Sequence, residues 1–138
     1  MGGADQQAQQ WLFVVRDLDS ARAVALVHLD AERLSAVYTA DSAARAADAA
    51  TISALAAQGF RVEGALHRIS AVRVIGASAA GGPGGAVRLE VTDSLPSYRV
   101  LDPNGSTVGS TGVRGQASRM MDVVGTADGY RISAVSTG

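Results

Sequence analysis

Two histidines are the side chains of this sequence best suited to acid–base chemistry near neutral pH. His67 has two interpretations, a general base at the mouth of a cavity or a histidine on the surface of a strand. His28 falls near the end of a predicted helix, where an imidazole meets the negative end of the helix dipole favourably. The sequence contains no H-x-x-x-H motif and no cysteine, so neither a metal site nor a thiol nucleophile is expected.

Three further residues are candidates for polar groups that line a cavity. Asp93 and Tyr98 belong to the segment "VTDSLPSYRV", in which Pro96 cannot donate to a sheet ladder. A bend or a sheet edge is therefore predicted there, with Asp93 and Tyr98 at a cavity rim. An ordinary bulge in a long hairpin is the alternative. Tyr38 is expected to be a partly buried core residue with its hydroxyl near the surface.

The other carboxylates are expected to face solvent. On a helix, Asp17 and Asp19 lie about 200° apart, so they cannot converge on one metal ion or proton. Asp48 is expected on the exposed side of its helix. Glu90 and Asp122 alternate with apolar neighbours, which places both on the outer face of a sheet.

Two glycine-rich stretches invite comparison with phosphate-binding loops. "GGPGG" (81–85) and "GSTGVRG" (109–115) are not followed by a helix, whose first N–H groups would hold the phosphate. The sequence also lacks G-x-x-x-x-G-K-[ST], because it contains no lysine. Both stretches are predicted to be loops or bulges between strands, and no cofactor is expected.

The composition is that of one globular domain: 138 residues, 47% of them hydrophobic, with a net charge of −1. Its twelve basic residues are all arginines, spread evenly from Arg16 to Arg131 without the basic stripe that nucleic-acid binding needs. Arginine without lysine, together with abundant alanine, indicates a GC-rich bacterial genome. The apolar segment "WLFVVRDLDSARAVALV" is interrupted by charges, so it is neither a membrane span nor a signal peptide.

Helical periodicity dominates the first half of the chain. A stripe with spacings of four and three, apolar except at Arg22, predicts a long amphipathic helix; its residues are Trp11, Val15, Leu18, Arg22, Ala25 and Leu29. Asp30 is predicted to cap a short second helix, 31–38. The third, 43–58, is predicted to end at Gly59 in the left-handed conformation that favours glycine.

Strand periodicity follows. The turn signal "LDPNGST" separates the second predicted strand from the third, and "GTADG" separates the third from the fourth. The chain is therefore predicted to be an α+β protein with three N-terminal helices packed on a curved four-stranded antiparallel meander sheet. The predicted strands are 67–76, 86–91, 118–124 and 130–135.

This order of elements resembles the nuclear-transport-factor-like superfamily, in which a curved sheet wraps a long N-terminal helix into a cone. The amphipathic first helix, the exit "LAAQGFRV" and the ending "MMDVVGTADGYRISAV" carry the resemblance. More narrowly, the chain resembles small actinobacterial domains of this fold that often follow a signal or membrane anchor. That likeness implies one domain at 10–138 on the outer side of a membrane. Residues 1–9 are expected to be disordered or artificially added, as in a chain trimmed after an anchor.

The resemblance leaves function open between two classes. Catalytic members of the superfamily place Asp, His and Tyr inside the cone, and this sequence is poor in such residues. The favoured expectation is a non-catalytic binding or scaffolding domain of an envelope protein, with a protein partner or self-association through the sheet face. The alternative is an enzyme or ligand binder of the isomerase, dehydratase or cyclase type, with Tyr38, His67, Asp93 and Tyr98 lining the cavity. A third possibility is a subunit whose apolar sheet face is buried only in a complex.

Overall fold

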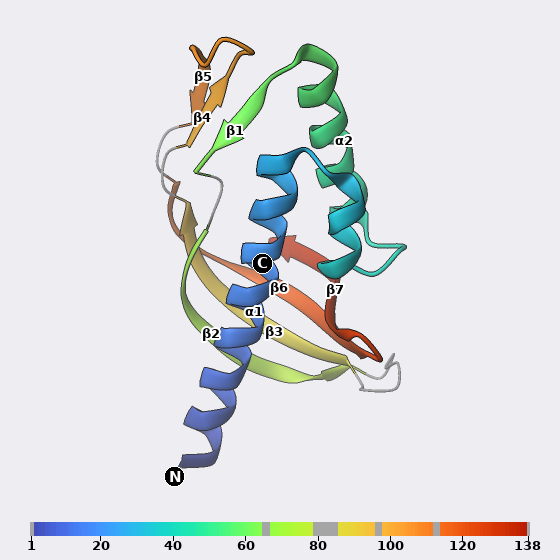
Figure 1. Ribbon diagram of the computed structural model, residues 1–138. Helices are drawn as coiled ribbons and strands as arrows, with labels where there is room; N and C mark the ends of the chain where they lie inside the picture. Colours follow the sequence, from blue (N-terminus) through green and yellow to red (C-terminus); the bar gives the residue numbers. More distant parts are fainter. Residues whose placement is uncertain (1, 65–66, 79–85, 96–97, 112–113, 138) are drawn as a thin grey trace.

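The computed structural model describes residues 2–64, 67–78, 86–95, 98–111 and 114–137. The predicted "GGPGG" loop and Pro96 lie outside these residues. In Figure 1 a curved four-stranded sheet wraps around one long helix, a second helix lies beside the first, and a small sheet closes one end. The elements are α1 (Gly2–His28), the 3-10 helix η1 (Ala31–Ala36), α2 (Ala43–Gln58), β1 (Arg61–Glu63), β2 (Arg68–Ser78), β3 (Ala86–Leu95), β4 (Tyr98–Leu101), β5 (Thr107–Thr111), β6 (Arg114–Thr126) and β7 (Gly129–Thr137).

The predicted apolar stripe of the first helix is confirmed. Trp11, Val15 and Leu18 are buried on the side of α1 that faces the sheet, whereas Phe13 on the opposite side is exposed. Trp11 packs edge-on against Tyr130 of β7, with ring centroids 5.0 Å apart. The helix begins at Gly2 and its first turns project past the sheet (Figure 1), so the structure continues α1 through residues expected to be disordered or added.

Each of the two remaining helices begins at a residue whose side chain caps its first turn. The Asp30 carboxylate accepts from the N–H of Glu32 at 3.2 Å, as predicted, although η1 is a 3-10 helix. Ser42 caps α2 through its hydroxyl. Gly59 has φ 71° and ends α2, and the next N–H bonds back to the carbonyl of Leu55 at 2.9 Å, which is the predicted helix ending.

The four predicted strands of the large sheet are confirmed, in the order β2-β3-β6-β7 with antiparallel pairing throughout. The predicted connection between the second and third of them is wrong. The turn at "LDPNGST" forms, with the N–H of Gly105 bonded to the carbonyl of Asp102 at 2.9 Å. However, it joins β4 to β5, and β4 also pairs with β1, so the three strands form a separate sheet in the order β1-β4-β5. In "GSTGVRG", predicted as a loop or bulge, the described residues belong to β5 and β6.

The core lies between α1 and the concave face of the large sheet. Leu89 and Val91 of β3 and Val123 of β6 are completely buried. Burial of each such side chain contributes about 1.5–3 kcal/mol. Because β3 and β6 are the two central strands, these residues fix which face of the sheet points inward.

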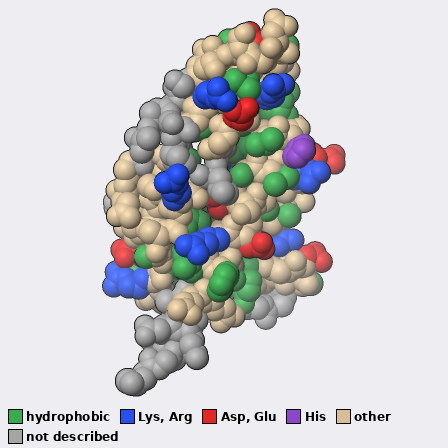
Figure 2. All heavy atoms as spheres, turned by 60° about the vertical axis from the view of Figure 1, so that its left-hand side comes forward, with side chains coloured by type: hydrophobic (Ala, Val, Ile, Leu, Met, Phe, Trp, Pro, Cys, Tyr) green, Lys and Arg blue, Asp and Glu red, His purple; other side chains and the backbone are tan. Residues whose placement is uncertain are grey.

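The convex face of the sheet carries pairs of opposite charge. Glu90 receives a bond from Arg73 of the neighbouring strand at 3.2 Å, and Asp122 receives one from Arg88 at 2.9 Å. The predicted outward orientation of both acids is confirmed. On the side drawn in Figure 2, acidic and basic side chains are interspersed rather than gathered by sign. Within the described residues, no helix is both long enough and apolar enough to cross a bilayer.

Candidate cavity between the first helix and the sheet

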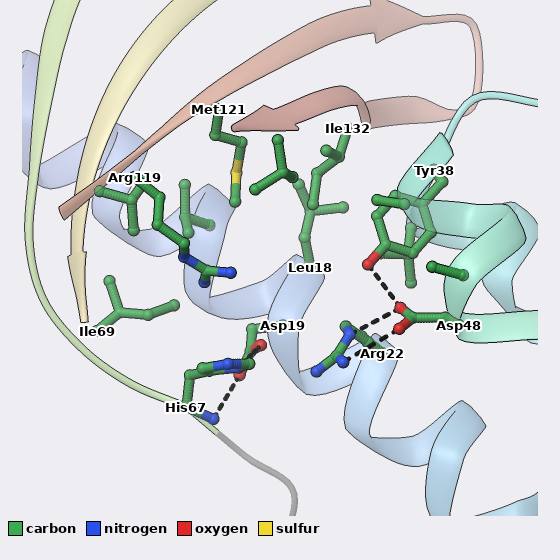
Figure 3. Close-up of a pocket in the computed structure, with 16 residues that line it drawn as sticks. Leu18, Asp19, Arg22, Tyr38, Asp48, His67, Ile69, Arg119, Met121 and Ile132 are labelled. Carbon is green, nitrogen blue, oxygen red and sulfur yellow. Dashed lines mark hydrogen bonds and ion pairs between the residues drawn. The ribbon is translucent and has the colours of Figure 1, made fainter. Parts of the chain in front are cut away.

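A cavity of about 190 Å³ lies between α1, α2 and the concave face of the sheet. Its wall is apolar over most of its extent, but several ionisable side chains point into it (Figure 3). The ionisable lining comes from separate elements, so only the folded chain brings it together. These residues are Asp19, Arg22, Tyr38, Asp48, His67 and Arg119.

Asp19 and His67 form a buried pair that ties α1 to the start of β2. The Asp19 carboxylate accepts from the backbone N–H of His67 at 3.0 Å, and its other oxygen lies 2.8 Å from His67 Nδ1. A carboxylate can only accept, so Nδ1 carries the proton and Nε2 is left for other partners. Side-chain exposures of 11% for His67 and 10% for Asp19 show that water competes little for this contact.

Arg22, Asp48 and Tyr38 form a second buried cluster. Asp48 accepts two hydrogen bonds from Arg22, at 2.8 and 3.1 Å, and one from the Tyr38 hydroxyl at 2.7 Å. Tyr38 is held by backbone bonds of its neighbours to Ile132 of β7. The cluster therefore joins α1, α2 and the edge of the sheet.

These contacts keep both donors of the second cluster protonated. Burial raises the pKa of the Tyr38 phenol above its usual value, and the hydrogen bond to Asp48 raises it further. For Arg22, burial alone would lower the pKa, but the bond to Asp48 and attraction to that carboxylate outweigh it, so the pKa rises. Neither group is a base at physiological pH.

Arg119 reaches into the cavity from β6. Its Nη2 donates to the carboxylate of Asp93, which is completely buried on β3. Its Nε is also buried and finds no acceptor among the described residues. The Arg119 side chain is 25% exposed, and Figure 3 shows its guanidinium directed into the cavity from the sheet side.

The sequence-predicted candidates are not all in one place. Tyr38 and His67 line the cavity. Tyr98 instead lines a neighbouring cavity of about 180 Å³, which shares Arg22, Asp48 and His67 with the first. Asp93 belongs to the wall of neither and lies buried, bonded to Arg119.

Two predictions about carboxylates are wrong. Asp19 was expected on a solvated face but is buried against His67. Asp48 was expected on the exposed side of its helix but faces Arg22 and Tyr38. In both cases a buried partner from another segment satisfies the charge, which sequence alone does not reveal.

Neither arginine of the site was predicted as a site residue, although Arg22 falls on the periodic stripe of the first helix and Arg119 also carries a signal. Arg119 lies two positions before the buried Met121 on the same strand, so period-two alternation places both on the inner face. Within the described residues, no three potential metal ligands of the His, Cys, Asp or Glu type lie close enough to hold one ion.

Comparison with known structures places this geometry on a fold seen before. The intermembrane space region of chloroplast protein ARC6 has a TM-score of 0.63 and 16% identity, covering 95% of this chain and 97% of that chain. Aln2 from a Streptomyces species has a TM-score of 0.53 and 14% identity, covering 92% of this chain and 89% of that chain. The fold is shared with both.

These likenesses support the nuclear-transport-factor-like resemblance at the level of an α+β fold. No protein-family model matches the chain, and no curated protein matches its sequence. Function must therefore be argued from the cavity itself.

Proposed function

We propose that this is a non-catalytic binding domain that takes a small ligand into the cavity between α1 and the sheet. The observation that carries the proposal is the cavity of about 190 Å³ with an apolar wall and ionisable side chains held in fixed positions. Ligand sites in proteins are concave and mostly apolar, with a few polar groups that orient the ligand. An engineered apolar cavity of about 150 Å³ holds benzene, so a small organic molecule is the appropriate size.

The polar groups are organised before a ligand arrives. Asp48 already accepts from Arg22 and Tyr38, and Asp19 already accepts from His67. Side chains fixed in this way lose little conformational entropy when a ligand binds. The same pairing argues against Arg22 or Tyr38 as a catalytic base, because both stay protonated at neutral pH.

Binding is tested by a fragment screen on the full chain, with amide chemical shifts as the readout. Ala44→Leu adds side-chain volume at the cavity wall, whereas Ala46→Leu adds the same volume on the exposed side of α2. We expect fragments to shift the amides around the cavity and to bind at least tenfold more weakly to the Ala44→Leu protein. Equal affinity in the two variants would place binding elsewhere and refute the proposal.

An acid–base enzyme is the second candidate, favoured by the Asp19–His67 pair. Asp19 holds Nδ1 of His67 at 2.8 Å, which leaves Nε2 as the proton acceptor of an imidazole that lines the cavity. A ketone probe, cyclohexanone in D₂O, separates the two candidates. Deuterium exchange next to its carbonyl, present in the native protein and lost in His67→Gln, favours the enzyme. Binding without exchange favours the non-catalytic domain.

An extracytoplasmic position and a protein partner complete the proposal. The position is supported by the sequence resemblance, together with a fold shared with a region that in ARC6 lies in the intermembrane space. Locating the protein in fractionated cells tests it. Self-association through the sheet would have to use the face that bears the Arg73–Glu90 and Arg88–Asp122 pairs. Sedimentation of the chain over a range of concentrations tests that association.

A further inference from the structure

We infer that the cavity selects a neutral ligand, an apolar body whose carbonyl-type oxygen accepts hydrogen bonds from Arg119. This inference rests on the proposed function, because it names the chemistry of the ligand in that cavity. On the cavity wall, the carboxylates already accept hydrogen bonds, whereas one arginine has a donor without a partner among the described residues.

Unused donors are concentrated at Arg119. A guanidinium carries five N–H groups and no acceptor. Here Nη2 donates to Asp93, while the buried Nε has no acceptor among the described residues. By contrast, Arg22 engages Asp48 through two nitrogens. A buried donor without a partner is unfavourable, so a ligand that brings an acceptor oxygen to this guanidinium is selected.

The carboxylates of the wall are already engaged. Asp48 accepts three hydrogen bonds, from Arg22 and Tyr38, and Asp19 is held by two contacts with His67. A ligand rich in donors would therefore compete with bonds that hold the fold together. Among the described ionisable residues of the wall, the groups still open to a ligand are therefore one acceptor, Nε2 of His67, and the N–H donors of Arg119.

The charges of the site favour a neutral acceptor over an anion. Two arginines, Arg22 and Arg119, face three carboxylates at or behind the wall, those of Asp19, Asp48 and Asp93. Each arginine already has one of these carboxylates as its partner. A bound carboxylate would add a further negative charge where three carboxylates already outnumber two arginines, and the low dielectric of a buried site would amplify the repulsion.

The apolar part of the wall determines that the body of the ligand is apolar. Aliphatic side chains and one thioether surround the polar groups, and they contribute affinity through burial of apolar surface. These residues include Leu18, Ile69, Val91, Met121, Ile132 and Val135.

Three probes of similar size test the inference on the full chain. Acetophenone has a neutral carbonyl, ethylbenzene lacks it, and benzoate carries a charge in its place. Dissociation constants come from amide shift titrations of the native protein and of two variants. Because Arg119→Met alone would remove the hydrogen bond that Arg119 donates to the buried Asp93 carboxylate, the test variant is Asp93→Asn/Arg119→Met, and Asp93→Asn alone is the matched control.

We expect acetophenone to lose affinity about tenfold in the double variant, as the loss of a hydrogen bond to a charged donor predicts, and to keep it in Asp93→Asn. Ethylbenzene should bind all three proteins alike, and benzoate should bind the native protein more weakly than acetophenone does. An equal loss for acetophenone and ethylbenzene, or tighter binding of benzoate, overturns the inference but leaves the proposed function standing. If none of the probes binds the cavity, the proposed function fails as well.

Discussion

Asp19 of α1 holds both the backbone and the side chain of His67. One carboxylate oxygen accepts from the His67 N–H at 3.0 Å, and the other lies 2.8 Å from Nδ1. The two residues are 48 positions apart in the chain. The contact therefore fixes where the large sheet begins relative to the helix that it wraps.

Replacing Asp19 should weaken the fold because the carboxylate is buried and satisfies two groups. We expect Asp19→Asn to lower the free energy of unfolding by about 1–3 kcal/mol, the usual effect of leaving a buried polar group poorly paired. Urea denaturation measures the change. Asp17→Asn is the matched control, since Asp17 is exposed on the same helix and should change stability by less than about 0.5 kcal/mol. Equal effects of the two substitutions would show that the Asp19 contact does not stabilise the protein.

The helices and the large sheet could be predicted because their signals are long. The apolar stripe of α1 spans many turns, and β3 alternates between buried and less buried positions from Leu89 to Ser94. The small sheet could not be predicted in the same way. Its strands β1, β4 and β5 have 3, 4 and 5 residues, too few for alternation to be recognised.

The site was harder to predict because residue type and periodicity disagree there. Charged residues are rarely buried, which favoured a solvent-facing assignment for Asp48. Its position four residues before the buried Ile52 points the other way. Asp93 follows Val91 by two positions and is buried with it. Periodicity thus indicated burial, but the partners Arg22 and Arg119 come from other elements and only the folded chain reveals them.

Removing the carboxylate of Asp48 should be more damaging than removing one on the convex face. Asp48→Ala leaves Arg22 and the Tyr38 hydroxyl without their acceptor, and we expect a loss of about 2–4 kcal/mol, somewhat below that of a fully buried pair. The side-chain exposures are 23% for Arg22 and 13% for Asp48. Asp122→Ala is the control, because its partner Arg88 is exposed and the pair contributes little. Denaturation curves of the two variants should differ clearly. Similar midpoints would contradict the conclusion that Asp48 stabilises the fold as the acceptor of Arg22 and Tyr38.

Alkaline pH should destabilise the native protein through Tyr38. Its pKa is raised in the folded state by burial and by Asp48, so the unfolded chain loses this proton first as the pH rises. The stabilisation is complete below the ordinary tyrosine pKa of about 10 and is lost progressively above it. Unfolding free energies measured between neutral and strongly alkaline pH should fall less steeply for Tyr38→Phe than for the native protein. Parallel curves would show that Tyr38 does not contribute to the pH dependence.

Gly59 joins the end of α2 to the small sheet and should tolerate no side chain. Its φ of 71° lies in the left-handed region, and a Cβ there would lie 3.0 Å from Cγ of Pro103 in the turn between β4 and β5. We expect Gly59→Ala to lower the free energy of unfolding by about 1–2 kcal/mol from backbone strain alone, with a further loss if Pro103 must move. Gly76→Ala is the control, because a Cβ at Gly76 in β2 would meet nothing within 4 Å and should leave stability unchanged or raise it slightly. Thermal or urea denaturation measures the stability of the Gly59→Ala and Gly76→Ala proteins. If both glycines tolerate alanine equally, the close approach of α2 to this turn is not what positions the small sheet.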